Sequence, residues 1–231
     1  MKSHIQFGLS RIDFDLEFSE RQTLGITVTP EMNVLVRAPA AATVQKVHEK
    51  LRKKAPWIIK QKSFFLSFHP RTPPRRFVSG ETHLYLGRQY RLKIEESSRE
   101  SVRLKGQFIL VRASKKDRVK RLVHDWYLRK AREKFRSIAT LLIEGFKKHK
   151  VAPTDIVIRE MPMRWGSCTS KGKIILNPEL IKAPRTCIEY VIVHELCHLL
   201  QPDHTQKFID LQTKEMPQWE KWKTKLENLL A

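Results

Sequence analysis

The sequence predicts an α+β fold in which a β-rich N-terminal region, residues 1–113, precedes a second domain, residues 114–231. Three observations lead to this expectation. Short runs of β-branched and aromatic residues recur up to residue 113. Apolar residues at helical spacing then extend from about Lys116 to His149. The last third combines short strand patterns with a helix that carries two histidines four residues apart.

The first third of the chain predicts a small sheet followed by a helix. Three segments have strand patterns: FDLEF (14–18), LGITV (24–28) and MNVLVRAP (32–39). We expect them to pair in antiparallel fashion, as short consecutive strands often do. Residues 43–62 place apolar side chains at helical spacing, with Thr43 as the N-cap. Pro56 predicts a kink in this helix, or a break between two short helices.

The middle of the chain predicts two hairpins and one long helix. Residues 82–96 turn around Gly87, and residues 101–113 turn around Gly106, each between strand-like segments. The long helix follows from about Lys116 to His149.

The last third predicts two strands and two helices. The strands IVIRE (156–160) and KIILN (173–177) flank a turn that contains glycine and serine. A helix from about Pro184 to Leu200 ends before Pro202. Thr205 then caps a further helix.

The composition favours a globular protein inside the cell. The chain has 231 residues, 41% of them hydrophobic, which is enough for one core or two small ones. No apolar run approaches the roughly 20 residues of a membrane span, and none follows the opening MKSHIQFG. The three cysteines lack the pattern of a disulfide framework, so we expect them to be reduced. These features predict a cytoplasmic protein with no membrane partner.

The net charge of +21 is unevenly distributed. Residues 1–149 hold 33 basic and 14 acidic residues, whereas residues 150–231 hold 12 and 10. Residues 50–76 contain nine basic residues and no acidic one, and residues 115–136 are a second basic stretch. The first stretch also contains aromatic residues, and this pattern has two interpretations. The favoured one is a solvated basic face over a packed aromatic cluster; the alternative is a nucleic-acid surface, which combines basic and aromatic side chains. Those aromatic residues are Trp57, Phe64, Phe65 and Phe68.

The segment YVIVHELCHLLQPDHTQKF (190–208) has the pattern of a metal site. On a helix, His194 and His198 lie one turn apart on one face, so their imidazoles can bind one metal ion. Glu195 follows His194 directly and lies beside that face, where its carboxylate can take a proton from a metal-bound water. The order of these three residues therefore predicts a metal-dependent hydrolase.

His204 is the candidate third ligand of the metal. Because Pro202 ends the helix, the chain can reverse and return His204 to the metal, six residues after His198. Glu215 on the following helix is the alternative third ligand. Three protein ligands and one water are typical of a catalytic zinc site, so we expect Zn²⁺ as the cofactor.

Several motifs occur in order along the chain: RWGSC (164–168), IILNPEL (174–180) and YVIVHELCHLLQPDH (190–204). With weaker upstream features such as RQTLGITV and YLGRQYRLKI, they resemble the YgjP-like family of predicted metal-dependent hydrolases, also called DUF45. The resemblance spans nearly the whole chain. It implies a zincin-like catalytic domain, related to SprT-like and WLM-type metallopeptidases, with a small sheet over the zinc helix.

The same resemblance implies where a substrate would lie. Residues 164–168 and the strand at 173–177 would line the cleft, and an edge strand would pair with an extended polypeptide. The candidate substrate-binding residues are Arg164, Trp165 and Asn177. For Arg164 the alternative is a structural ion pair.

Three functions compete at this point. The first is a zinc-dependent metallopeptidase in which Glu195 activates the water. The second is hydrolysis of nucleoside triphosphates, since members of the YgjP-like family are also assigned activity on UTP; the chain lacks a Walker A loop and a magnesium-binding carboxylate cluster. The third is a nucleic-acid-associated protein with a secondary zinc site, although the basic stretches 50–76 and 115–136 match no recognised nucleic-acid-binding motif.

Overall fold

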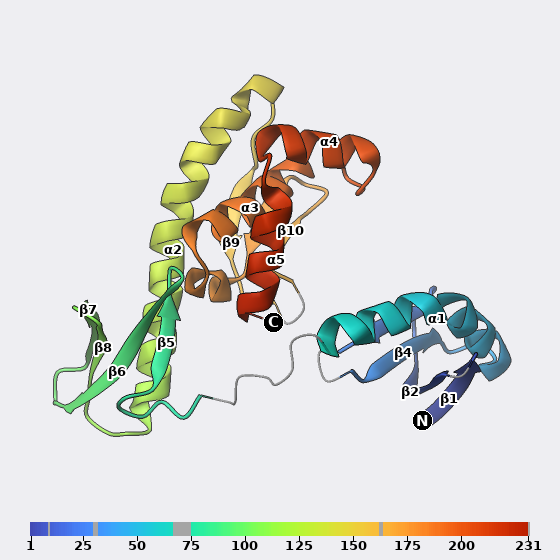
Figure 1. Cartoon of the computed structure of the whole chain (residues 1–231), viewed down its shortest axis with the longest axis horizontal. Coiled ribbons are helices and arrows are strands. Elements are labelled where there is room, and N and C mark those ends of the chain that lie inside the picture. Colours follow the sequence, from blue (N-terminus) through green and yellow to red (C-terminus); the bar gives the residue numbers. More distant parts are fainter. Residues whose placement is uncertain (9, 30–31, 67–74, 162–163, 231) are drawn as a thin grey trace. The chain divides into compact units, whose positions relative to one another are not determined.

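The chain forms two units, Met1–Pro73 and Pro74–Leu230. Each unit has its own sheets, helices and hydrophobic core (Figure 1). No helix in the described part of the chain is both long and apolar enough to cross a membrane. The computed structural model describes residues 1–8, 10–29, 32–66, 75–161 and 164–230.

The N-terminal unit is a four-stranded sheet with one helix packed on one face. Residues of β2 alternate, so that Ile12 and Phe14 are buried while Asp13 and Asp15 are exposed. The buried residues pack against one face of α1, which includes Leu51. In spatial order the strands are β1 (Lys2–Phe7), β2 (Ser10–Ser19), β4 (Val34–Pro39) and β3 (Gly25–Val28), followed in sequence by the helix α1 (Val44–Leu66).

The structure corrects the expected strand pairing of this unit and excludes one of the two alternatives at Pro56. Strands β2 and β4 are parallel, not antiparallel, because β4 inserts between β2 and β3 and forms its antiparallel pair with β3. The predicted break at Pro56 is absent, since α1 continues through it. Leu51, Ala55 and Ile58 are fully buried on either side of the exposed Pro56, so packing on the sheet holds the helix together where one hydrogen bond is missing.

The C-terminal unit is built around the long helix α2 (Arg118–Phe146), which the 3₁₀ turn η1 (Lys147–His149) extends. Both expected hairpins are present, and they join through parallel pairing of β6 with β8. Figure 1 shows this sheet beside the N-terminal part of α2. Its strands, in spatial order, are β5 (Thr82–Tyr85), β6 (Arg88–Glu96), β8 (Phe108–Ala113) and β7 (Ser101–Lys105).

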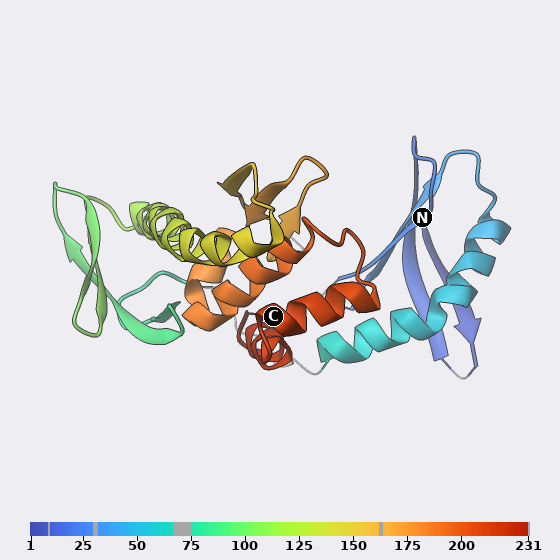
Figure 2. The same cartoon turned by 90° about the horizontal axis from the view of Figure 1, so that it is seen from above.

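A second sheet and three helices complete the C-terminal unit. The sheet has the order β10 (Gly166–Cys168), β11 (Lys173–Leu176), β9 (Asp155–Ile158), and β10 packs against α3. Figures 1 and 2 show α3 between α2 and α5. After the 3₁₀ turn η2 (Pro178–Lys182), the helices are α3 (Arg185–Cys197), α4 (Gln206–Glu215) and α5 (Trp219–Leu230). The α+β class with a small sheet over the histidine-bearing helix is therefore confirmed.

The hairpin β5–β6 is fixed to the helices of the C-terminal unit. Its turn residues Leu86 and Gly87 have positive φ angles, and both donate backbone N–H groups to carbonyls of η2, at 2.8 and 3.0 Å. A side chain at Gly87 would collide with Pro184, because its Cβ would lie 2.6 Å from the proline ring. The Tyr127 hydroxyl of α2 donates to the Leu84 carbonyl at 2.7 Å.

The division between the units thus differs from the expected boundary between residues 113 and 114. The structure places it between residues 73 and 74, because Tyr85, Leu92 and Ile109 of the hairpins share one core with α2 and α3. A strand pattern shows that hairpins form, but not which helices they pack on.

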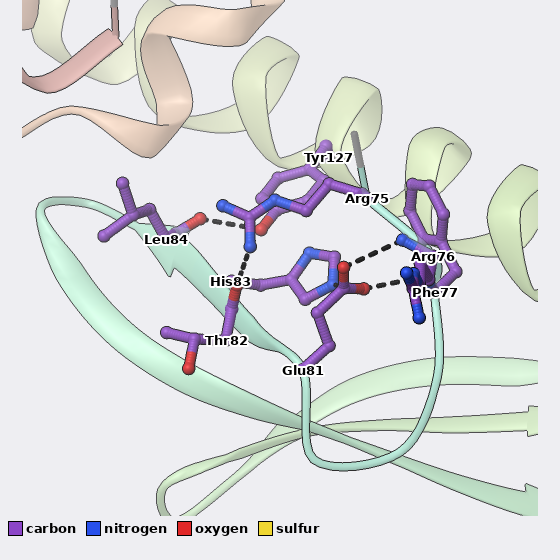
Figure 3. A network of polar contacts seen from close by, with 8 residues as sticks. All are labelled: Arg75, Arg76, Phe77, Glu81, Thr82, His83, Leu84 and Tyr127. Atoms are coloured by element: carbon purple, nitrogen blue, oxygen red, sulfur yellow. Dashed lines mark hydrogen bonds and ion pairs between the residues drawn. The ribbon is translucent and has the colours of Figure 1, made fainter. Parts of the chain in front are cut away.

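A network of hydrogen bonds around Glu81 fixes the first described residues of the C-terminal unit (Figure 3). The Glu81 carboxylate accepts the backbone N–H groups of Arg76 and Phe77, at 2.9 and 2.8 Å. It also bonds Nε2 of His83, which is 3% exposed, at 3.0 Å. Burial opposes ionisation of Glu81, but these three hydrogen bonds outweigh it and lower the pKa of the carboxyl below its ordinary value.

We expect Glu81→Gln to destabilise the protein by about 1 kcal/mol or more at neutral pH, because a charge-assisted acceptor of two N–H groups is lost. Since the pKa of Glu81 is lowered on folding, its contribution is present above the unfolded pKa of 4.5 and disappears as the pH falls through the folded value. Denaturant unfolding at pH 7 and at about pH 3 checks this. The difference in the free energy of unfolding between wild type and Glu81→Gln should shrink at low pH. The control variant Glu96→Gln, at an exposed position, should unfold like wild type at pH 7. Equal unfolding curves for Glu81→Gln and wild type at pH 7 would contradict the role of this network.

Candidate metal centre and active site

Three histidine side chains converge at the end of α3. His194 lies in the last turn of the helix, His198 is its C-cap, and His204 comes from the loop before α4. One ring nitrogen of each lies within 4.8 Å of the other two. The Nε2 atoms of His194 and His204 are 3.1 Å apart. The predicted spacing thus brings all three imidazoles together.

Hydrogen bonds orient two of these rings. Nδ1 of His194 donates to Oε1 of Gln212 at 2.8 Å, and Nδ1 of His198 donates to the carbonyl of Gln201 at 3.2 Å. Because a carbonyl oxygen only accepts, each Nδ1 carries the proton and each Nε2 keeps its lone pair. Burial lowers the pKa of His194 to about 4 and also lowers the pKa of His198, so both rings are neutral near pH 7.

One aromatic side chain packs against all three histidine rings. Phe208 of α4 is 2% exposed, and its ring centroid lies 5.0, 4.6 and 4.8 Å from those of His194, His198 and His204. The alternative ligand Glu215 is engaged elsewhere, since its carboxylate contacts His149 at 2.9 Å and Lys148 at 2.7 Å. The structure groups His204, and not Glu215, with the two helix histidines.

Glu195 is buried beneath β10, next to the triad. Its side chain fits there because Gly166 has no Cβ: a Cβ at that position would lie 2.5 Å from Oε1 of Glu195. Burial raises the pKa of Glu195 to about 7, while the charge of Arg164 and a hydrogen bond from the Cys168 backbone act in the opposite direction. A carboxyl group with this pKa can both accept and return a proton near neutral pH.

The triad and Glu195 lie in a cleft of about 700 Å³. Besides the triad and Glu195, the cleft is lined by Arg164, residues 166–170, which include the whole of β10, Gly172, Leu199 and Pro202. β10 is at the edge of its sheet, paired with β11 on one side and with no described strand on the other. The site therefore combines three neutral nitrogen donors, a buried carboxyl group and a sheet edge in one cleft.

Comparison with known proteins identifies the family. The model of the YgjP-like family, described as a metallopeptidase domain, matches residues 22–229. The chain belongs to the YgjP-like family. The resemblance inferred from the motifs is thus confirmed, and with it the class of metallopeptidase-type hydrolases that depend on a metal ion.

Two solved structures are similar to part of this YgjP-like chain. The metallopeptidase zymogen abylysin of Pyrococcus abyssi is 22% identical with a TM-score of 0.37, over 40% of this chain and 94% of that one. The metallopeptidase zymogen jannalysin of Methanocaldococcus jannaschii is 18% identical with a TM-score of 0.37, over 42% and 97%. No curated protein matches the chain.

Of the three residues that were expected to bind substrate in the YgjP-like chain, the structure places one in the cleft. Arg164 lines it. Asn177 is 5% exposed, and its amide donates to the carbonyls of Met161 and Arg164 at 2.8 and 3.0 Å while its Oδ1 accepts the N–H of Glu179 at 3.1 Å. Trp165 packs on the core, and its carbonyl accepts the N–H of Asn177. Asn177 and Trp165 therefore shape the segment that presents Arg164.

Two residues of this site did not emerge from the sequence. Gln212, which orients His194, is 1% exposed and follows Phe208 by four residues, so it lies on the buried face of α4. A polar residue on that face was the signal that could have revealed it. Gly166 lies inside the RWGSC motif, and a glycine within a strand often marks the close approach of another group.

Proposed function

We propose that this YgjP-like chain is a zinc-dependent peptidase. His194, His198 and His204 hold the ion, and Glu195 is the general base. The observation that carries this proposal is the approach of three imidazole nitrogens within 4.8 Å of one another, beside a buried carboxyl group in an open cleft. The family match independently supports peptide hydrolysis.

The donor set fits zinc. Imidazole nitrogens are common zinc ligands, and three of them leave a fourth position open for the reaction. The protein fixes the two helix histidines through Gln212 and the Gln201 carbonyl, as expected of residues that orient metal ligands. When bound, zinc supplies a Lewis acid that polarises the scissile carbonyl and makes water more acidic.

Proton transfer is the role of Glu195. One of its carboxylate oxygens takes the proton from the attacking water and then delivers it to the nitrogen of the leaving amine. The contact with Gly166 and the hydrogen bond from the Cys168 backbone hold the carboxylate in place. A fixed base needs little rearrangement before it reacts.

Substrate binding is assigned to β10 and Arg164. The outer edge of β10 presents backbone groups that can pair with an extended polypeptide, which would align a peptide bond across the cleft. Arg164 lines the same cleft, where its guanidinium group can donate to a carbonyl or carboxylate of the substrate.

Hydrolysis of UTP is less well supported by this cleft. Among the described residues that line it, Arg164 is the one permanent cation and Glu195 the one carboxylate. A nucleoside triphosphate normally needs magnesium, held by oxygen ligands, together with several cationic contacts. The cleft therefore favours the peptide as substrate.

The proposal is tested by incubating the purified full-length protein with an unfolded polypeptide and, in parallel, with a panel of nucleoside triphosphates. We expect cleavage of the polypeptide that a chelator stops, that zinc restores and that added magnesium does not alter. A hydroxamate that binds zinc should also stop it. Magnesium-dependent hydrolysis of UTP without any cleavage of the polypeptide would overturn the assignment.

A further inference from the structure

The lysines of α1 form one exposed stripe in the N-terminal unit. Lys46, Lys50, Lys53 and Lys60 recur at intervals of three, four and seven residues, so they share about a quarter of the helix circumference. All four are exposed. The opposite face of α1 is buried against the sheet, so the fold of this unit uses none of these lysines.

A tryptophan completes the stripe. Trp57 lies between Lys53 and Lys60 at the same helical spacing, and it is 42% exposed. Tryptophan is usually well buried, so this accessible ring is available for contact with another molecule. We call Lys46, Lys50, Lys53, Trp57 and Lys60 the α1 stripe. The other aromatic residues of this basic stretch, Phe64, Phe65 and Phe68, have side chains outside the described part of the chain.

The lysines of the α1 stripe form no ion pair with a described carboxylate, although Glu49 lines the same hollow as Lys46, Lys50 and Lys53. No described Asp or Glu oxygen lies within 4.0 Å of its lysine nitrogens, and α1 contains a single acidic residue, Glu49. The second basic stretch, residues 115–136, differs. There Arg118 pairs with Glu100 at 2.8 Å and Lys130 with Glu133 at 2.8 Å, and the aromatic residues Trp126 and Tyr127 are buried.

We propose that the α1 stripe binds single-stranded nucleic acid, with its lysines on the phosphates and an unpaired base stacked on Trp57. Contacts with phosphates account for a row of lysines without ion-pair partners, and stacking with a base accounts for the exposed Trp57 ring within that row. A membrane surface fits less well, because the apolar face of α1 is already buried and Trp57 alone would enter the lipid. This function is additional to peptide hydrolysis and does not depend on the metal site.

The test is a titration of labelled oligo-dT and oligo-U with the full-length protein, followed by fluorescence anisotropy. If four lysines contact phosphates, a plot of log affinity against log salt should have a slope of about −3, which weakens binding about 50-fold between about 50 and 200 mM salt. Stacking on Trp57 should also quench tryptophan fluorescence. A slope near zero, or no binding at the lower salt concentration, would overturn the proposal.

Variants distinguish this surface from net charge alone. Reversing Lys46, Lys50, Lys53 and Lys60 to Glu should abolish binding, and Trp57→Ala should weaken it roughly tenfold. The matched control makes the same charge change in the second basic stretch, at Lys116 just before α2 and at Lys120, Arg129 and Arg132 on α2, and should retain most of the affinity.

Metal content reports on folding and should be unchanged in all of these variants. Equal losses in the α1 and α2 variants would show a general attraction of polyanions to a basic protein. If Trp57→Ala binds the labelled oligonucleotide as tightly as wild type does, and heparin competes as well as the unlabelled oligonucleotide, no base is stacked on Trp57. Either result would reject the α1 stripe as a nucleic-acid site.

Discussion

Replacing Glu195 by glutamine should abolish hydrolysis of a polypeptide and leave the metal in place. Glutamine has nearly the same shape as glutamate, so it fits beneath Gly166, but its amide cannot take a proton from water. Loss of a general base typically lowers kcat by about 10²–10⁴-fold. The measurement is kcat on an unfolded protein substrate, together with the metal content of the same preparation.

A second variant tests the position of the carboxylate separately from its chemistry. In Gly166→Ala the new methyl group would lie 2.5 Å from Oε1 of Glu195, so the carboxylate has to move and kcat should fall at unchanged metal content. Gly145→Ala is the matched control, because nothing lies within 4 Å of its Cβ and activity should be normal. The assignment of Glu195 as the base fails if Glu195→Gln retains turnover or loses the metal.

The approach of the three histidines was predictable because its determinants are local. Helical periodicity alone places His194 and His198 on one face, and Pro202 forces the reversal that returns His204. The convergence of the three rings follows from fewer than a dozen consecutive residues. Such short-range geometry depends little on how the rest of the chain folds.

The remaining differences come from contacts between distant segments. The parallel pairing of β2 with β4 depends on which strand occupies the centre of the sheet, and strand patterns carry no such information. Asn177 was expected to bind the substrate, but its side-chain amide donates to backbone carbonyls of Met161 and Arg164, in the segment before β10. Gln212 reaches His194 only because α4 folds back onto α3.

Replacing His194 or His198 by alanine should remove the metal, because one of three protein ligands is lost and the helix offers no substitute. Activity should disappear with it. Gln212→Leu should have a smaller and more informative effect. Leucine cannot accept the Nδ1–H of His194, so metal affinity should fall about 10–100-fold, as is typical when a residue that orients a ligand is removed.

Competition with a chromogenic chelator measures both effects. Gln212→Glu keeps an acceptor oxygen for Nδ1 and should retain affinity, whereas Gln206→Leu, an exposed position on the same helix, should resemble wild type. This order of affinities separates orientation of His194 from simple packing, since Leu fills the buried space as well as Gln does. If Gln212→Leu binds the metal as tightly as wild type, the hydrogen bond to His194 does not orient a ligand, and the role of Gln212 is limited to the packing of α4 on α3.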